Sequence, residues 1–124
     1  MLTAVDLSPV ESYVNALRRR DFDAIQEVLA QGVVFRALIP PGFRDRADAR
    51  TTRELIQRWF GDADAFEMQW STVEAVADRV HAGYRVRLRE DGTWKLCEQH
   101  LFAITQDGAI QSADLICSGF RAEA

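Results

Sequence analysis

Apolar side chains in the first part of the chain recur at the spacing of an α-helix, in two successive segments. The first segment opens with Ser8 as the expected cap and Pro9 at the first helical position. Its apolar stripe consists of Val10, Tyr13, Val14 and Leu17. The second segment begins after Asp21 and ends at Gly32, where a left-handed conformation is expected. The two segments predict a helical hairpin.

Residues 33–39 are rich in apolar and β-branched side chains and predict a strand, which ends at Pro40-Pro41-Gly42. A charged loop is expected at residues 43–47. A third helix is predicted from about Asp48 to Gly61. Its expected buried side consists of Leu55, Ile56, Trp59 and Phe60.

From about residue 66 the pattern changes to alternation of apolar and polar side chains, which is typical of half-buried strands. Asp91-Gly92 and Asp107-Gly108 favour tight hairpin turns between them. Four consecutive strands are therefore predicted after the helices. The apolar series that define them are Phe66/Met68/Trp70, Val80/Ala82/Tyr84/Val86/Leu88, residues 94–104 and residues 110–120. This order predicts an α+β fold with an antiparallel sheet wrapped over three N-terminal helices.

The composition is that of one folded domain covering residues 1–124. The chain has 15 Lys plus Arg against 19 Asp plus Glu, so its net charge is −4, and 48% of its residues are hydrophobic. The negative charge argues against nucleic-acid binding, although arginines cluster at three places. No stretch approaches the roughly 20 apolar residues of a membrane helix. The N-terminus lacks a basic region, so a cytoplasmic protein without membrane contact is expected.

The cysteines and histidines show no metal-binding spacing. Cys97 and Cys117 lie outside any CxxC motif, so both are interpreted as reduced packing residues. His81 and His100 are far apart in sequence and form no HxxxH or HxxE pair. We therefore expect neither a metal ion nor a cofactor.

The segments Val10 to Leu17, Asp21 to Ile25, His100 to Ile104 and Asp107-Gly108-Ala109-Ile110 resemble the nuclear transport factor 2-like superfamily. The resemblance covers nearly the whole chain and is strongest to its SnoaL-like and steroid delta-isomerase-like branches. It implies a cystatin-like fold in which a strongly curved, cone-shaped antiparallel sheet closes over the helices. It also implies a small apolar pocket at the mouth of the cone. The same fold carries isomerases, cyclases, dehydratases and non-catalytic domains, so the fold alone does not determine the activity.

The resemblance places Tyr13 at the position of a catalytic tyrosine and His100 at that of a second hydrogen-bond donor. The position of the family's catalytic base falls on Ala37, which cannot take up a proton. His100 is therefore the candidate for proton transfer, and Tyr13 would stabilise an enolate-like oxygen. The alternative for both is a structural, hydrogen-bonded core residue. Glu98, two residues before His100, would orient the imidazole or lie solvated at the pocket rim.

The expected pocket wall is apolar for the most part, and the same residues also suit a simple core. Its substrate-binding candidates are Trp59, Met68, Trp70, Tyr84, Val86, Glu98, Phe102, Leu115 and Cys117. A two-residue turn at Asp107-Gly108 would set His100 opposite Leu115 and leave Asp114 outside. A three-residue turn would set Asp114 opposite His100 as a carboxylate–histidine dyad. In the first register Cys97 and Cys117 point to opposite faces.

The two functional hypotheses share one fold. The first is an enzyme of polyketide cyclase-like type, a cofactor-independent isomerase, cyclase or dehydratase that acts on a hydrophobic, carbonyl-bearing molecule. The second is a non-catalytic ligand-binding or assembly domain. A homodimer is expected through the outer sheet face. There we expect an apolar patch formed by Cys97, Leu101, Ala103, Ile116 and Ile110.

Overall fold

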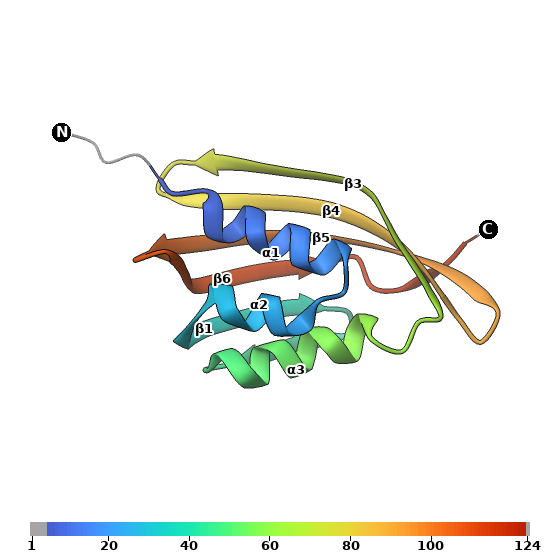
Figure 1. Cartoon of the computed structure of the whole chain (residues 1–124). Helices are drawn as coiled ribbons and strands as arrows, with labels where there is room; N and C mark the ends of the chain where they lie inside the picture. The colour runs from blue at the N-terminus through green and yellow to red at the C-terminus, as the bar shows by residue number, and fades with distance from the viewer. Residues whose placement is uncertain (1–4, 124) are drawn as a thin grey trace.

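The three helices lie along one face of a curved sheet, and the apolar core fills the space between them (Figure 1). The computed structural model describes residues 5–123. Its elements are α1 (Ser8–Arg18), α2 (Phe22–Val28), β1 (Leu29–Ile39), β2 (Gly42–Arg46), α3 (Ala49–Phe60), β3 (Ala65–Val76), β4 (Arg79–Glu90), β5 (Thr93–Gln106), β6 (Ala109–Cys117) and β7 (Arg121–Ala122). The predicted α+β cone is confirmed.

The sheet has the strand order β2-β1-β6-β5-β4-β3, with β7 beside the first half of β5. All neighbours are antiparallel except β1 and β6, which run parallel, so the prediction of a wholly antiparallel sheet is wrong on this pair. β1 and β6 are far apart in sequence, and the long connection between them is what parallel pairing requires. The segment predicted as a charged loop is instead β2, which folds back on β1 and pairs Phe35 with Arg46.

Two predicted helix ends are wrong, whereas the start of α2 at Asp21 and both ends of α3 are confirmed. Ser8 is not the cap of α1, because the carboxylate of Asp6 accepts hydrogen bonds from its N–H and its hydroxyl, at 3.0 and 2.7 Å. α2 ends at Val28 rather than Gly32, since Leu29 turns to extended backbone and joins β1. Asp48 caps α3 as predicted and accepts the Thr51 N–H at 2.7 Å.

The turn at Asp91-Gly92 decides which residues of β5 face the helices. Glu90 pairs with Thr93 across this turn, so Tyr84 lies opposite Gln99 farther along the hairpin. Paired residues of neighbouring strands share a face of the sheet. The inner face of β5 therefore carries Cys97, Gln99, Leu101 and Ala103. The predicted inward facing of Glu98, His100 and Phe102 is wrong, and all three lie on the outer face.

Two bulges shift the register by one residue and exchange faces beyond them. In β3, Met68 pairs with Val86 but Trp70 pairs with Arg85, so Trp70 turns outward and its side chain is 38% exposed. Trp70 is thus not part of the inner wall where it was predicted.

The second bulge follows the β5–β6 turn. Gln106 faces Ala109, as the two-residue turn predicts, but the register then shifts. His100 lies opposite Ile116, and Phe102 lies opposite Asp114. Neither predicted partner of His100 is its neighbour, and the His100–Asp114 dyad does not form. The Asp114 carboxylate accepts a hydrogen bond from Arg36 at 2.7 Å instead.

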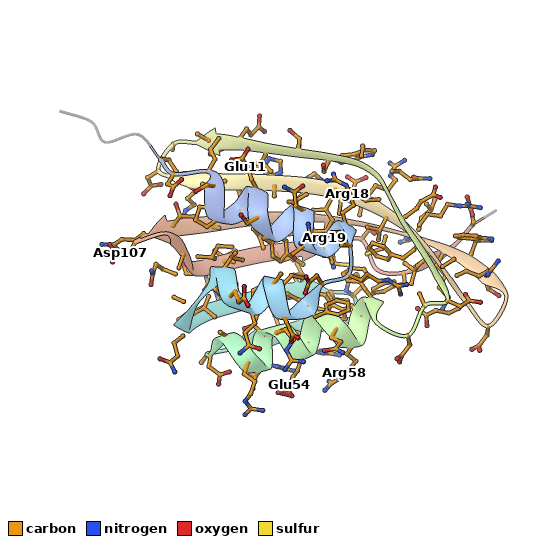
Figure 2. All side chains as sticks on the ribbon, viewed as in Figure 1. Glu11, Arg18, Arg19, Glu54, Arg58 and Asp107 are labelled. Atoms are coloured by element: carbon orange, nitrogen blue, oxygen red, sulfur yellow. The ribbon has the colours of Figure 1, made fainter. Side chains whose placement is uncertain are left out.

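Aromatic side chains close the core at the C-terminal end of α3. Phe60 is fully buried and contacts Trp59, Phe66 and Phe120, with ring centroids 5.7 to 6.2 Å apart. The outer sides of the helices are polar: Figure 2 shows Glu11 and Arg18 on α1, Arg19 directly after it, and Glu54 and Arg58 on α3. The helices thus place their apolar sides on the inner face of the sheet.

We expect Phe60→Ala to lower the free energy of unfolding by about 3–5 kcal/mol, because it leaves a cavity among the three aromatic rings that surround Phe60. Val76→Ala is the control, since Val76 is 44% exposed and lies outside the core, and its effect should stay within about 1 kcal/mol. Urea denaturation followed by circular dichroism measures both values. Similar losses in the two variants would contradict this account of the core.

Candidate functional site

The structure divides the predicted site residues between the two faces of the sheet. Tyr84, Val86, Leu115 and Cys117 are buried on the inner face, and Tyr13 reaches it from α1. Trp59 and Met68 are half-buried against the same core. The outer face carries Trp70, Glu98, His100 and Phe102. The sheet therefore separates Tyr13 from His100, and the expectation that both act on one ligand in one pocket is wrong.

A row of polar side chains crosses the inner face, and we call Tyr13, Tyr84, Gln99, Cys117 and Cys97 the inner polar row. The Tyr84 hydroxyl donates to Gln99 Oε1 at 2.6 Å, so the Tyr13 hydroxyl, 2.9 Å away, is left to donate to Tyr84. Burial raises the pKa of both tyrosines, which keeps them as protonated donors.

Gln99 is the polar centre of this row and was not predicted from the sequence. Its side chain is 0% exposed, and its Nε2 makes no hydrogen bond of normal geometry with the described residues. The amide lies beside the Cys117 thiol and contributes to lowering the pKa of that thiol. A buried N–H without a full partner costs about 1–3 kcal/mol. This amide is therefore a donor that an acceptor atom in the interior would satisfy.

The two cysteines meet at the end of the row. The Sγ atoms of Cys97 and Cys117 lie 3.5 Å apart, and both are free thiols. The prediction that they point to opposite faces is wrong, because the β5–β6 bulge brings Cys117 opposite Gln99 on the inner face. The interpretation of both as reduced thiols matches the described structure.

The outer face carries a second row, and we call Glu74, His81, His100 and Glu98 the outer histidine row. It runs across β3, β4 and β5. Glu74 Oε1 lies 3.1 Å from His81 Nδ1, His81 Nε2 lies 2.9 Å from His100 Nδ1, and His100 Nε2 lies 2.8 Å from Glu98 Oε2. Each imidazole thus contacts one carboxylate and the other imidazole.

The proton arrangement of this row follows from its contacts. Carboxylates only accept, so His81 Nδ1 and His100 Nε2 must both carry a proton. The two rings meet through their other nitrogens, His81 Nε2 and His100 Nδ1. The hydrogen bond from His100, aided by that from Arg85, holds the pKa of Glu98 below its ordinary value.

Close packing holds the two rings in place over Gly83. A Cβ at this position would lie 2.9 Å from Cε1 and Nδ1 of His100, so only glycine leaves room for the ring. Arg85 binds Glu98 at 3.1 Å and lies over the Trp70 ring, 5.9 Å from its centroid. The Arg85 guanidinium thus lies at the Glu98 end of the outer histidine row.

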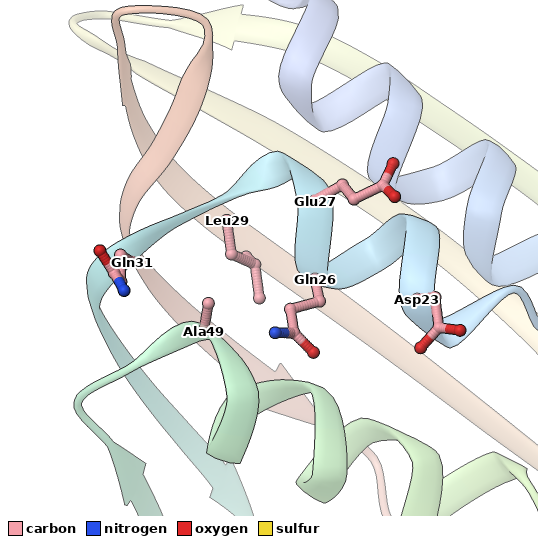
Figure 3. A pocket seen from close by; sticks show the side chains of 6 residues that line it. All are labelled: Asp23, Gln26, Glu27, Leu29, Gln31 and Ala49. Atoms are coloured by element: carbon pink, nitrogen blue, oxygen red, sulfur yellow. The ribbon is translucent and has the colours of Figure 1, made fainter.

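An open cleft of about 380 Å³ lies away from both rows, between α2, α3 and the start of β1 (Figure 3). It is lined by Asp23, Gln26, Glu27, Leu29, Gln31 and Ala49. None of the predicted site residues contributes to it. Residues 5–123 contain no cluster of three or more His, Cys, Asp or Glu arranged to hold a metal ion. Within the same residues no helix is long and apolar enough to cross a membrane.

The inward position of Gln99 and the outward position of His100 could have been predicted from the sequence. Asp91-Gly92 favours a two-residue turn, and the inner series of β4 includes Tyr84. Extending that register would have placed Gln99 inside and set His100 beside His81 on the outer face. The bulges in β3 and β6 have no comparable signal.

Comparison with known proteins supports one family. A sequence model of the SnoaL-like domain matches residues 10–113. No curated protein matches the chain. Solved structures of the same fold include an LEH-like epoxide hydrolase of M. tuberculosis, with 22% identity and a TM-score of 0.70 over 90% of this chain and 81% of that one.

Two further solved structures have the same fold. A candidate polyketide cyclase from Xanthomonas campestris pv. campestris has 21% identity and a TM-score of 0.70, over 88% of this chain and 87% of its own. TerC, crystallised with polyporic acid, has 13% identity and a TM-score of 0.67, over 88% of each chain. At these identities the likeness shows the fold alone.

We expect Gly83→Ala to destabilise the protein by about 1–3 kcal/mol, because the added methyl group displaces the His100 ring from its two hydrogen bonds. Gly32→Ala is the matched control in another strand, where nothing lies within 4 Å of the added carbon, and its effect should stay within about 1 kcal/mol. Thermal unfolding of both variants tests this. Equal melting temperatures would show that the outer histidine row is not packed as described.

Proposed function

Because the chain belongs to the SnoaL-like domain family, we propose that it binds a small, mostly apolar molecule with a carbonyl or hydroxyl oxygen. The proposed site lies between the helices and the inner face of the sheet. The observation that carries the proposal is the buried Gln99 Nε2, a donor without a hydrogen-bond partner among the described residues. A ligand oxygen would accept from it, while Tyr84 holds the other end of the amide in place.

The ligand would enter by displacing side chains at the aromatic end of the core. Trp59, Phe66 and Phe120 are only half-buried there, next to the fully buried Phe60. Their rings would supply an apolar wall for the ligand, as is usual in small-molecule sites. The polyporic acid bound to TerC supports a ligand of this kind on the same fold.

For the activity of the protein we propose a cofactor-independent isomerase, cyclase or dehydratase. Gln99 Nε2 would donate a hydrogen bond to a developing enolate oxygen in a water-poor interior, where such a bond is strong, and the Tyr13–Tyr84 hydroxyl pair would hold the amide in place. The candidate polyketide cyclase with this fold supports such chemistry. A non-catalytic binding domain is the alternative, and it predicts affinity without product. His100 stays outside this proposal, because the sheet lies between it and the interior.

We also propose that two copies pair through the outer sheet face. The predicted patch is wrong except for Ile116, because Cys97, Leu101, Ala103 and Ile110 are buried in the core. The outer patch consists instead of Val34, Leu38, Phe43 and Ile116, all exposed large apolar side chains. Leu38, Phe43 and Ile116 line a cleft of about 300 Å³ that also contains the Arg36–Asp114 ion pair.

The remaining sequence-based proposals are one domain over residues 1–124, a cytoplasmic location, and function without a metal or cofactor.

Native mass spectrometry after incubation with polyporic acid tests the ligand proposal. We expect a one-to-one complex, and we expect Gln99→Leu to weaken the affinity about tenfold, the value of one lost hydrogen bond. His100→Gln is the control, because this residue lies on the other face, and it should leave the affinity unchanged. An equal loss in both variants would contradict an interior site.

Light scattering after size-exclusion chromatography tests the pairing. We expect a dimer for the natural sequence and a monomer for Ile116→Arg, because an unpartnered charge cannot be buried in the outer patch. Gln31→Arg adds the same charge at the exposed cleft of Figure 3 and should remain a dimer. A natural protein that is monomeric would rule out the pairing.

A further inference from the structure

The two thiols of the inner polar row form a pair that ligand binding does not use. Cys97 lies within β5, and Cys117 is the last residue of β6. Their Sγ atoms are 3.5 Å apart, which is close enough for an S–H to donate to the other sulfur. Cys97 is 0% and Cys117 3% exposed. Two free thiols are thus held in contact on neighbouring strands.

The surroundings of the two sulfur atoms are unequal. The Gly119 N–H donates to Cys117 Sγ at 3.4 Å, and the Gln99 amide lies beside the same atom. The Gly119 N–H and the Cys97 S–H are thus the two groups that donate to Cys117 Sγ. The Cys97 hydrogen bond, assisted by Gln99 and Gly119, lowers the pKa of Cys117 to about 6. The same hydrogen bond and burial raise the pKa of Cys97, which stays a protonated donor.

We propose that Cys97 and Cys117 are a reversible redox pair, in which Cys117 reacts first with a peroxide and Cys97 then closes a disulfide. The oxidant is a small hydroperoxide, because both sulfur atoms are buried and a larger molecule would have to displace the core around them. Cys117 reacts first because it is the last residue of β6 and its sulfur accepts the Gly119 N–H, whereas Cys97 lies in the middle of the hydrogen-bonded part of β5.

The electron balance is that of a two-electron oxidation. The Cys117 thiolate attacks one peroxide oxygen, the O–O bond breaks, and a sulfenic acid and hydroxide form. Cys97 then gives up its proton, and its sulfur attacks Cys117 Sγ. The S–S bond forms as the sulfenic S–O bond breaks, and that oxygen leaves as water. Overall, two thiols and hydrogen peroxide give one disulfide and two waters, and a dithiol reductant reverses the change.

Hydrogen peroxide, followed by denaturation, alkylation of the remaining thiols and intact mass measurement, tests the proposal. The natural protein should lose two hydrogens, resist alkylation and regain both thiols with dithiothreitol. Cys97→Ser keeps a hydroxyl donor beside Cys117, so Cys117 should gain one or more oxygen atoms instead. Cys117→Ser leaves Cys97 as a buried, protonated thiol without a thiol partner, and the oxidation of Cys97 should be at least about ten times slower.

Several results would overturn the assignment. If the two serine variants are oxidised at equal rates, Cys117 is not the cysteine that reacts first. If the natural protein gains oxygen atoms without forming a disulfide, the two cysteines are not a redox pair. Alanine replacements repeat the test if a serine variant unfolds, as judged by circular dichroism. The experiment contains no ligand, so its failure leaves the proposed ligand site untouched, and a failed ligand experiment leaves the thiol pair untouched.

Discussion

The strict alternation of side chains along a strand is the constraint on which every assignment in this protein depends. A shift of one residue in pairing exchanges the inner and outer faces of a strand. The two-residue turn at Asp91-Gly92 fixes the pairing of β4 with β5, and through it the positions of Gln99 inside and His100 outside. The bulge between β5 and β6 then returns Cys117 to the inner face. These strand registers place the residues of both polar rows on their faces of the sheet.

The inner polar row shows how a core can hold polar groups at modest cost. The Tyr13 and Tyr84 hydroxyls and Gln99 Oε1 satisfy one another, and only the Nε2 end of the amide lacks a partner with normal geometry among the described residues. An apolar residue at position 99 would avoid the penalty of that unpaired donor. It would also remove the oxygen that accepts from the Tyr84 hydroxyl, so the unpaired Nε2 of Gln99 accompanies an amide oxygen that the two tyrosines use.

Much of the fold could be predicted from the sequence because its signals are local. The stripe on α1, the cap at Asp48 and the Asp-Gly turns each depend on neighbouring residues, and each gave the right element. The end of α2 was missed because Leu29 joins a strand whose partner, Ile110, is distant in sequence. The site was harder to predict because both faces of β5 carry apolar side chains. The alternation therefore did not show which face is buried, and the family resemblance placed His100 on the wrong face.

The bulge in β3 also affects how molecules of this protein meet in solution. β3 and β2 are the two edges of the sheet, where unpaired backbone groups could recruit a strand from another molecule. The bulge beside Trp70 interrupts the regular row of amides and carbonyls on β3, and β2 is short and carries Arg44, Asp45 and Arg46. Both edges are thus poor templates for strand addition. The same irregularity that turns Trp70 outward protects the sheet against edge-to-edge aggregation.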